Sequence, residues 1–195
     1  MRHLSKVVVA VVAVAVMTST ASAQRTVRTS SSAAAAQGGY WELGSDMGVM
    51  IGLDDPKSLS IQAPVGSFGT FPAFRAGYYV SDVLSLEPGL SFVSFAAKDQ
   101  TAFSLWTLAF GVNYHLSPDR NAARVYVHPF LSFTGGSGGR DTQTGLGAGI
   151  GLKKPAFSNR FNWRLEGGLQ HLLKAGFLDA SSGIYGTAGI SVFTK

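Results

Sequence analysis

The chain has 195 residues, of which 46% are hydrophobic and 24 are glycine, and its formal net charge is +5. It contains no cysteine. This excludes disulfide bonds, and it excludes a lipoprotein signal because such a signal attaches its lipid to a cysteine. The basic residues are scattered rather than gathered in a stripe, which argues against a nucleic-acid-binding protein.

The first 23 residues have the three-part layout of a secretory signal peptide. Basic Arg2 and Lys6 come first, an unbroken apolar run follows over residues 7–17, and Ala21-Ser22-Ala23 provides a small-x-small cleavage site before Gln24. The alternative is a retained membrane anchor, but an apolar run of this length spans only about half of a ~30 Å hydrocarbon core as a helix. Cleavage lowers the net charge to +3 and leaves 172 residues, enough for one domain.

After the signal peptide, residues 24–39 are small, polar and without periodicity, so we expect a flexible lead-in. Residues 40–195 are expected to form one domain. No apolar run in this domain approaches the ~20 residues of a membrane helix, because glycine, serine or a charge interrupts each one. If the domain crosses a membrane, it does so with strands.

The dominant pattern from residue 40 onward is strict alternation of apolar with polar or small residues, which is typical of strands. In 143–152, for example, Leu146, Ala148, Ile150 and Leu152 alternate with glycines. Turn-rich stretches separate the segments. Eight segments share the pattern: 40–53, 74–80, 83–92, 101–116, 124–133, 143–152, 161–172 and 183–193.

Residues 58–71 alternate as well, but Leu59 and Ile61 have the opposite parity to Phe74 and Tyr78. A bulge or break near 66–69 would reconcile the two. We therefore interpret 58–71 as an outward extension of the first hairpin rather than as a ninth strand.

An even number of alternating segments of ~10 residues predicts an all-β fold, an eight-stranded antiparallel up-and-down transmembrane β-barrel. Its apolar side chains face lipid and its polar ones face the interior, and closure leaves no unpaired backbone edge. Exchanging the two faces would instead give a soluble calycin-like barrel that binds a ligand. The aromatic residues near segment ends favour the membrane barrel: Trp41, Tyr78, Phe103, Tyr114, Phe161 and Phe193.

The polar face predicts a network of charged and polar side chains inside the barrel. The interior of an eight-stranded barrel is narrow enough for side chains to fill it, so we expect no open channel. If the connection at Ser81-Asp82 is effectively three residues, Arg75 and Glu87 lie directly opposite each other and form an ion pair. His115 and His128, with Glu87 or Asp46, could form an acid-base or metal cluster, although hydrogen-bonded histidines are the commoner arrangement. The predicted lumen residues are Glu42, Asp46, Arg75, Glu87, His115, Arg124, His128, Arg164 and Glu166.

Over residues 40–195 the chain resembles the small outer-membrane β-barrel family, the OmpA- and OmpX-like proteins. The resemblance lies in WELGSDMGVMIG as a first strand, in FRAGYYVSDVLSLEPGLSF as a tight second hairpin, and in a last strand at the chain end. It implies a bacterial outer-membrane location, contacts with lipid and lipopolysaccharide, insertion by the outer-membrane assembly machinery, and a monomer.

The resemblance leaves the role of the barrel open. We expect a structural or surface-interaction protein whose outer loops, chiefly 54–70, 134–142 and 174–183, contact lipopolysaccharide or an external partner. The alternative is a small-solute pore or carrier. The glycines of GLGAGIG lack the dinucleotide spacing and a following helix, and no Ser-His-acid motif of a lipid A hydrolase is evident near His171, Ser181 and Ser182. We therefore expect no catalytic residues, cofactor or metal.

Overall fold

The computed structural model describes residues 38–54, 57–62, 72–96, 103–137, 141–156, 160–176 and 178–194. The expected signal peptide and nearly all of the expected lead-in lie outside these residues. Residues 38–195 form one compact unit. Among the described residues, no helix has the length and apolarity needed to cross a membrane.

The described residues form strands at all eight predicted segments and one additional short strand. The strands are β1 (Tyr40–Gly52), β2 (Leu59–Gln62), β3 (Phe74–Tyr79), β4 (Leu84–Phe95), β5 (Phe103–His115), β6 (Arg124–Gly136), β7 (Gln143–Pro155), β8 (Phe161–Leu172) and β9 (Ser181–Phe193). β4, β6 and β7 continue three residues beyond their predicted ends, and β9 begins two residues before its predicted start. Thr134–Gly136 and Ser181–Gly183 therefore belong to strands rather than to the predicted outer loops.

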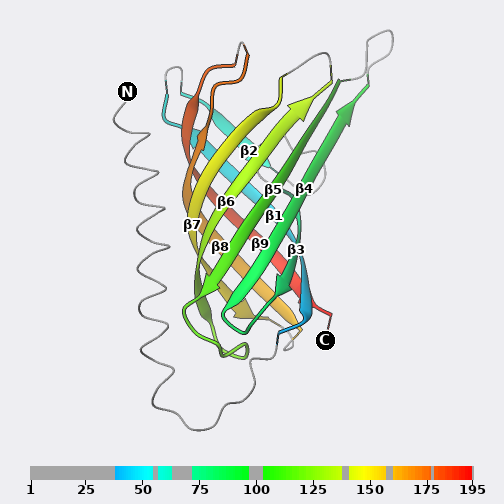
Figure 1. Cartoon of the computed structure of the whole chain (residues 1–195), viewed down its shortest axis with the longest axis vertical. Helices are drawn as coiled ribbons and strands as arrows, with labels where there is room; N and C mark the ends of the chain where they lie inside the picture. The colour runs from blue at the N-terminus through cyan, green and yellow to red at the C-terminus, as the bar shows by residue number, and fades with distance from the viewer. Residues whose placement is uncertain are drawn as a thin grey trace. The chain divides into compact units, whose positions relative to one another are not determined.

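The strands form one antiparallel sheet that closes into a barrel, as Figure 1 shows. Closure is made by β1 and β9, which are paired from Glu42↔Phe193 to Gly52↔Gly183. On its other edge β1 pairs with β3 along its first half and with β2 along its second half. β2 and β3 thus share one position in the wall, and the barrel has eight strand positions, which confirms the predicted fold.

β2 extends the first hairpin as predicted. Leu59 and Ile61 lie on the outside of the barrel, as does Phe74, although their parities differ. The change of parity therefore falls between β2 and β3, and the predicted site near 66–69 lies outside the described residues. Just before β3, Ala73 is buried and its carbonyl accepts a hydrogen bond from the Asp46 amide.

The two faces of the wall differ as the alternation predicts. Large apolar side chains on the outside are 37–67% exposed, whereas the charged side chains of the strands point inward and are buried, except for Lys154 near the end of β7. This is the reverse of a soluble calycin-like barrel and agrees with a wall that faces lipid. Buried aromatic side chains also fill the lumen near the end where the described chain starts and stops: Tyr40 stacks on Tyr79 at 4.3 Å between ring centroids, and Phe193 packs edge-on against both.

Phe193 corrects one prediction. The sequence places it among the aromatic residues of the outer face, but it is only 4% exposed and lies in the lumen. The reason is parity, since inward positions on β9 are odd-numbered, as buried Tyr185 and Ser191 show. Trp41, Phe103 and Phe161 are exposed on the outside as predicted.

Candidate functional site

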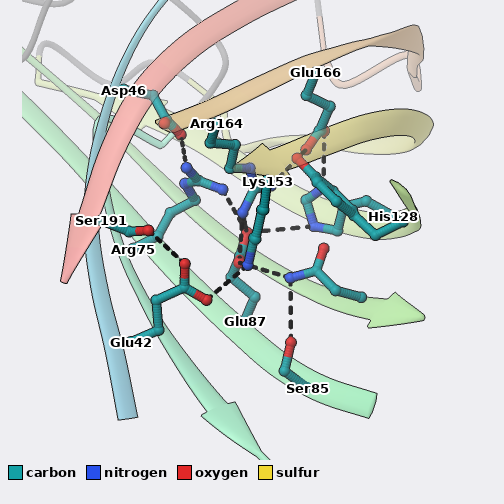
Figure 2. Close-up of polar contacts among 12 residues, drawn as sticks. Glu42, Asp46, Arg75, Ser85, Glu87, His128, Lys153, Arg164, Glu166 and Ser191 are labelled. Carbon is teal, nitrogen blue, oxygen red and sulfur yellow. Dashed lines mark hydrogen bonds and ion pairs between the residues drawn. The ribbon is translucent and has the colours of Figure 1, made fainter. Parts of the chain in front are cut away.

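The lumen contains the most concentrated polar chemistry of the barrel. All nine side chains predicted from the alternation lie there, and each is at most 7% exposed. They come from six strands, β1, β3, β4, β5, β6 and β8, because each of these strands turns every second residue inward. Figure 2 shows the central part of this network.

Glu87 of β4 lies at the centre of the network. Its carboxylate accepts hydrogen bonds from Arg75 Nη1 at 2.7 Å, from Arg164 Nη1 at 2.7 and 2.6 Å, and from Asn113 Nδ2 at 2.7 Å. Lys153 Nζ lies 3.8 Å from the same carboxylate. One buried anion thus holds two guanidinium groups, which is the arrangement that makes charge tolerable in a dry interior.

Arg75 and Glu87 form the predicted ion pair, but not by the predicted register. Arg75 lies directly opposite Gly89, two residues from Glu87. The turn between the strands is longer than expected: the amides of Val80 and Ser81 both donate to the carbonyl of Leu84, and β4 starts only there. The long arginine side chain bridges the diagonal, and Gly89 leaves it room because a Cβ there would lie 3.3 Å from Arg75 Cγ.

Glu166 of β8 is the second carboxylate centre, toward the other end of the network. It is paired with Arg164 of its own strand and with His128 Nδ1 at 2.8 Å. The hydroxyls of Tyr126 and Tyr185 each donate to it at 2.7 Å. Both carboxylate oxygens therefore have partners, so the buried charge is stabilised by hydrogen bonds as well as by ion pairs.

Glu42 of β1 forms a third centre near the aromatic end of the lumen. Lys153 Nζ and the Tyr79 hydroxyl each donate to Glu42 Oε2 at 2.7 Å, and the Ser191 hydroxyl of β9 donates to Glu42 Oε1. Arg124 Nη2 in turn donates to the Tyr79 hydroxyl at 3.2 Å. This centre joins β1, β3, β6, β7 and β9, including the pair of strands that closes the barrel.

The two predicted lumen histidines do not form a common cluster. His115 stacks on Tyr79 at 5.4 Å, and neither of its ring nitrogens has a hydrogen-bond partner among the described residues. His128 instead pairs with Glu166. Within the described residues, no group of three or more His, Cys, Asp and Glu side chains could hold a metal ion.

Sequence reasoning missed several members of the network. Lys153 is 1% exposed, whereas the sequence places it in a turn because KKP follows the glycine-rich strand. The signal was present, since Lys153 continues the odd-numbered inward positions of β7. Tyr79, Tyr126 and Asn113 also have inward parity, but an uncharged side chain at such a position does not indicate a partner.

The fold can be compared with solved structures, although no model of a protein family and no curated protein matches the sequence. Neisserial surface protein A (NspA) is similar, with 16% identity and a TM-score of 0.56 over 78% of this chain and 96% of that chain. The likeness shows a shared small-barrel fold.

Two further structures match over similar spans. The N-terminal β-barrel domain of Pseudomonas aeruginosa OprF has 18% identity and a TM-score of 0.43, with coverage of 80% of this chain and 99% of that one. The attachment invasion locus protein Ail of Yersinia pestis has 11% identity and a TM-score of 0.44 at the same coverage.

Proposed function

We propose that this chain is an integral β-barrel protein of a bacterial outer membrane with a structural or surface-interaction role. The observation that carries the proposal is the pairing of an apolar outer wall with a closed, charged and filled interior. Exposed Leu, Ile, Val and Phe side chains around a closed sheet are unfavourable in water but suit lipid, where every backbone group must be paired within the protein. The proposed partners are lipid, lipopolysaccharide and the assembly machinery, and the barrel acts as a monomer.

The filled lumen favours a plug over a small-solute pore. Glu87 of β4 pairs with Arg164 of β8, and Lys153 of β7 pairs with Glu42 of β1, so ion pairs cross the interior between non-neighbouring strands. The cavity beside this network has a volume of about 30 Å3, which is too small for a solute larger than water. Opening a path would separate buried ion pairs, at a cost of several kcal/mol each.

We assign the surface role to the loops at the end of the barrel opposite Tyr40 and Phe193. Among them, residues 173–176 and 178–180 are held in a defined shape: Gln143 Nε2 donates to the carbonyls of Leu173 and Asp179 at 3.1 Å each, and Ala175 and Leu178 pair through two backbone hydrogen bonds. A preformed loop loses less entropy on binding than a flexible one. We assign the contact with lipopolysaccharide or an external partner to this end.

No enzymatic activity is proposed. His171 Nδ1 and Ser182 Oγ are hydrogen-bonded at 2.9 Å across β8 and β9, which is a suitable distance for a base and a nucleophile. Among the described residues, however, no carboxylate orients His171. The Ser182 amide, rather than the histidine, is the group bound to Asp54. We interpret the pair as a cross-strand contact at the membrane boundary.

The proposal can be tested by refolding residues 24–195 from denaturant into lipid vesicles and, separately, into buffer. Strand signal in circular dichroism only with lipid, together with no single-channel conductance in a planar bilayer, is the expected result. Folding in buffer alone would refute the membrane assignment. Steady conductance would refute the filled lumen and favour the small-solute pore. Binding of lipopolysaccharide vesicles that is lost when 174–179 is replaced by a glycine-serine loop would support the surface role.

A further inference from the structure

Six ionisable side chains of the lumen form one connected cluster, which we call the charged ring: Asp46, Arg75, Glu87, Arg164, Glu166 and His128. Contacts run from Asp46 to Arg75, then to Glu87, Arg164, Glu166 and His128. His128 Nε2 lies 3.9 Å from Glu87, so the last four residues form a closed ring to which Arg75 and Asp46 are attached. Five strands contribute, and Figure 2 shows the members converging.

A small cavity lies beside these six side chains, all of which line it. Ala109 and Phe130 form part of its remaining wall. Its volume of about 30 Å3 exceeds the roughly 10–15 Å3 that one water molecule requires. The cavity therefore has room for one or two waters and for no larger ligand.

The members of the charged ring also carry polar atoms that have no hydrogen-bond partner within the described part of the chain. They are Asp46 Oδ1, His128 Nε2 and the Nε atoms of Arg75 and Arg164. Each side chain is more than nine-tenths buried, so each orphaned atom is costly unless something in the cavity satisfies it.

The chemistry of these four atoms is complementary to water. The two Nε–H groups can only donate, and Asp46 Oδ1 can only accept. His128 Nδ1 faces the Glu166 carboxylate at 2.8 Å and so carries a proton, and Nε2 accepts in the neutral imidazole and donates in the imidazolium. A water molecule can accept from the two Nε–H groups and donate to Asp46 Oδ1 in either state of His128.

The charge of the lumen favours a neutral occupant over an ion. The charged ring has three carboxylates and two guanidinium groups, but Lys153 Nζ lies 3.8 Å from Glu87 and offsets the surplus. Over the whole network, Glu42, Asp46, Glu87 and Glu166 are balanced by Arg75, Arg124, Lys153 and Arg164. Counted without His128, the four carboxylates and the four basic groups cancel, so the network has no surplus of one sign that requires a bound ion.

We propose that the charged ring encloses a structural water molecule that donates to Asp46 and accepts from Arg75 and Arg164. The aromatic side chains Phe130 and Tyr185 pack against each other beside the cavity, with ring centroids 5.8 Å apart, and limit exchange with bulk solvent. The water completes the hydrogen bonding of the plug and is expected to be long-lived.

The test is a crystal structure of the protein at a resolution that reveals ordered water, from crystals grown with rubidium chloride. A density peak within hydrogen-bond distance of Asp46 Oδ1 and of at least one other orphaned atom, without anomalous signal, is expected. An empty cavity would overturn the proposal. Anomalous signal from rubidium at the peak would also overturn it, because the occupant would then be a cation.

A cavity-filling variant provides a second readout in solution. Ala109 faces the lumen of β5 and is 4% exposed, so Ala109→Val places added methyl groups in the cavity. Oxygen-17 relaxation dispersion should show one fewer long-lived water than in the wild type. Ala148→Val, the same change on the outer face of β7, is the matched control and should leave the count unchanged. The same number of long-lived waters in Ala109→Val as in the wild type would contradict the proposal. If Ala109→Val does not fold, the electron density of the wild-type crystal decides the question.

Discussion

Glu87→Gln should be among the most destabilising conservative changes in this barrel. The substitution keeps the shape of the side chain and removes the negative charge that faces Arg75 and Arg164 at 2.6–2.7 Å and Lys153 at 3.8 Å. Loss of one partner from a buried ion pair costs about 3–5 kcal/mol, because the remaining charge is left without compensation. We therefore expect the free energy of unfolding to fall by about 3–5 kcal/mol.

The assay is urea unfolding of the barrel in lipid vesicles, followed by fluorescence of tryptophans that include Trp41 and Trp163 on the outer face. Asp179→Asn is the matched control: it removes a carboxylate from the ion pair with Lys174, whose two side chains are 88% and 67% exposed, and should cost about 1 kcal/mol or less. Adding Arg164→Met to Glu87→Gln should recover part of the loss. Equal effects of Glu87→Gln and Asp179→Asn would refute the argument.

Three further predictions address the wall, the glycines and the leader. Ile150 is 64% exposed on the outside, so Ile150→Arg should lower the free energy of unfolding in the same vesicles by about 2–4 kcal/mol, whereas Ile150→Val should be tolerated. Equal stability of the two variants would contradict the assignment of Ile150 to the lipid-facing side. A Cβ on Gly151 would overlap the ring of Tyr126, so Gly151→Ala should lower the free energy of unfolding by about 1–3 kcal/mol. Gly167 faces outward and is the control: the atom nearest to a Cβ there is 3.7 Å away, so Gly167→Ala should be close to neutral. Finally, N-terminal sequencing of the protein from bacterial membranes should begin at Gln24, and a sequence that begins at Met1 would contradict signal-peptide cleavage.

The strands could be predicted from sequence because their periodicity is local. In β7, Leu146 and Ile150 show the outer face and the glycines between them show the inner one, without knowledge of any neighbouring strand. Strand ends were less certain. Lys153 and Lys154 resemble a turn because Pro155 follows them, but the closed barrel continues β7 to that proline and turns Lys153 into the lumen.

The pairing of side chains across the lumen could not be predicted from local periodicity, because it depends on the register of strands that are distant in the sequence. Alternation places Glu42 and Lys153 inside, yet nothing local indicates that residues 111 positions apart meet at 2.7 Å. The Arg75–Glu87 pair could be predicted only as a neighbour within one hairpin, and its diagonal geometry depends on where the turn ends. The tyrosine hydroxyls that donate to Glu166 could not be predicted for the same reason.

This limit suggests what the lumen network does for folding. A slip of one residue between strands exposes the inner face to lipid and is excluded by the alternation, but a slip of two residues keeps every side chain on its proper face. Contact with lipid discriminates weakly against such a slip, because most outward-facing side chains are apolar. The lumen can detect it, since two residues shift a side chain by roughly 7 Å, enough to separate Glu87 from Arg164 and Lys153 from Glu42. Alternation thus determines which face is inside, and the buried ion pairs favour one register among those that alternation permits.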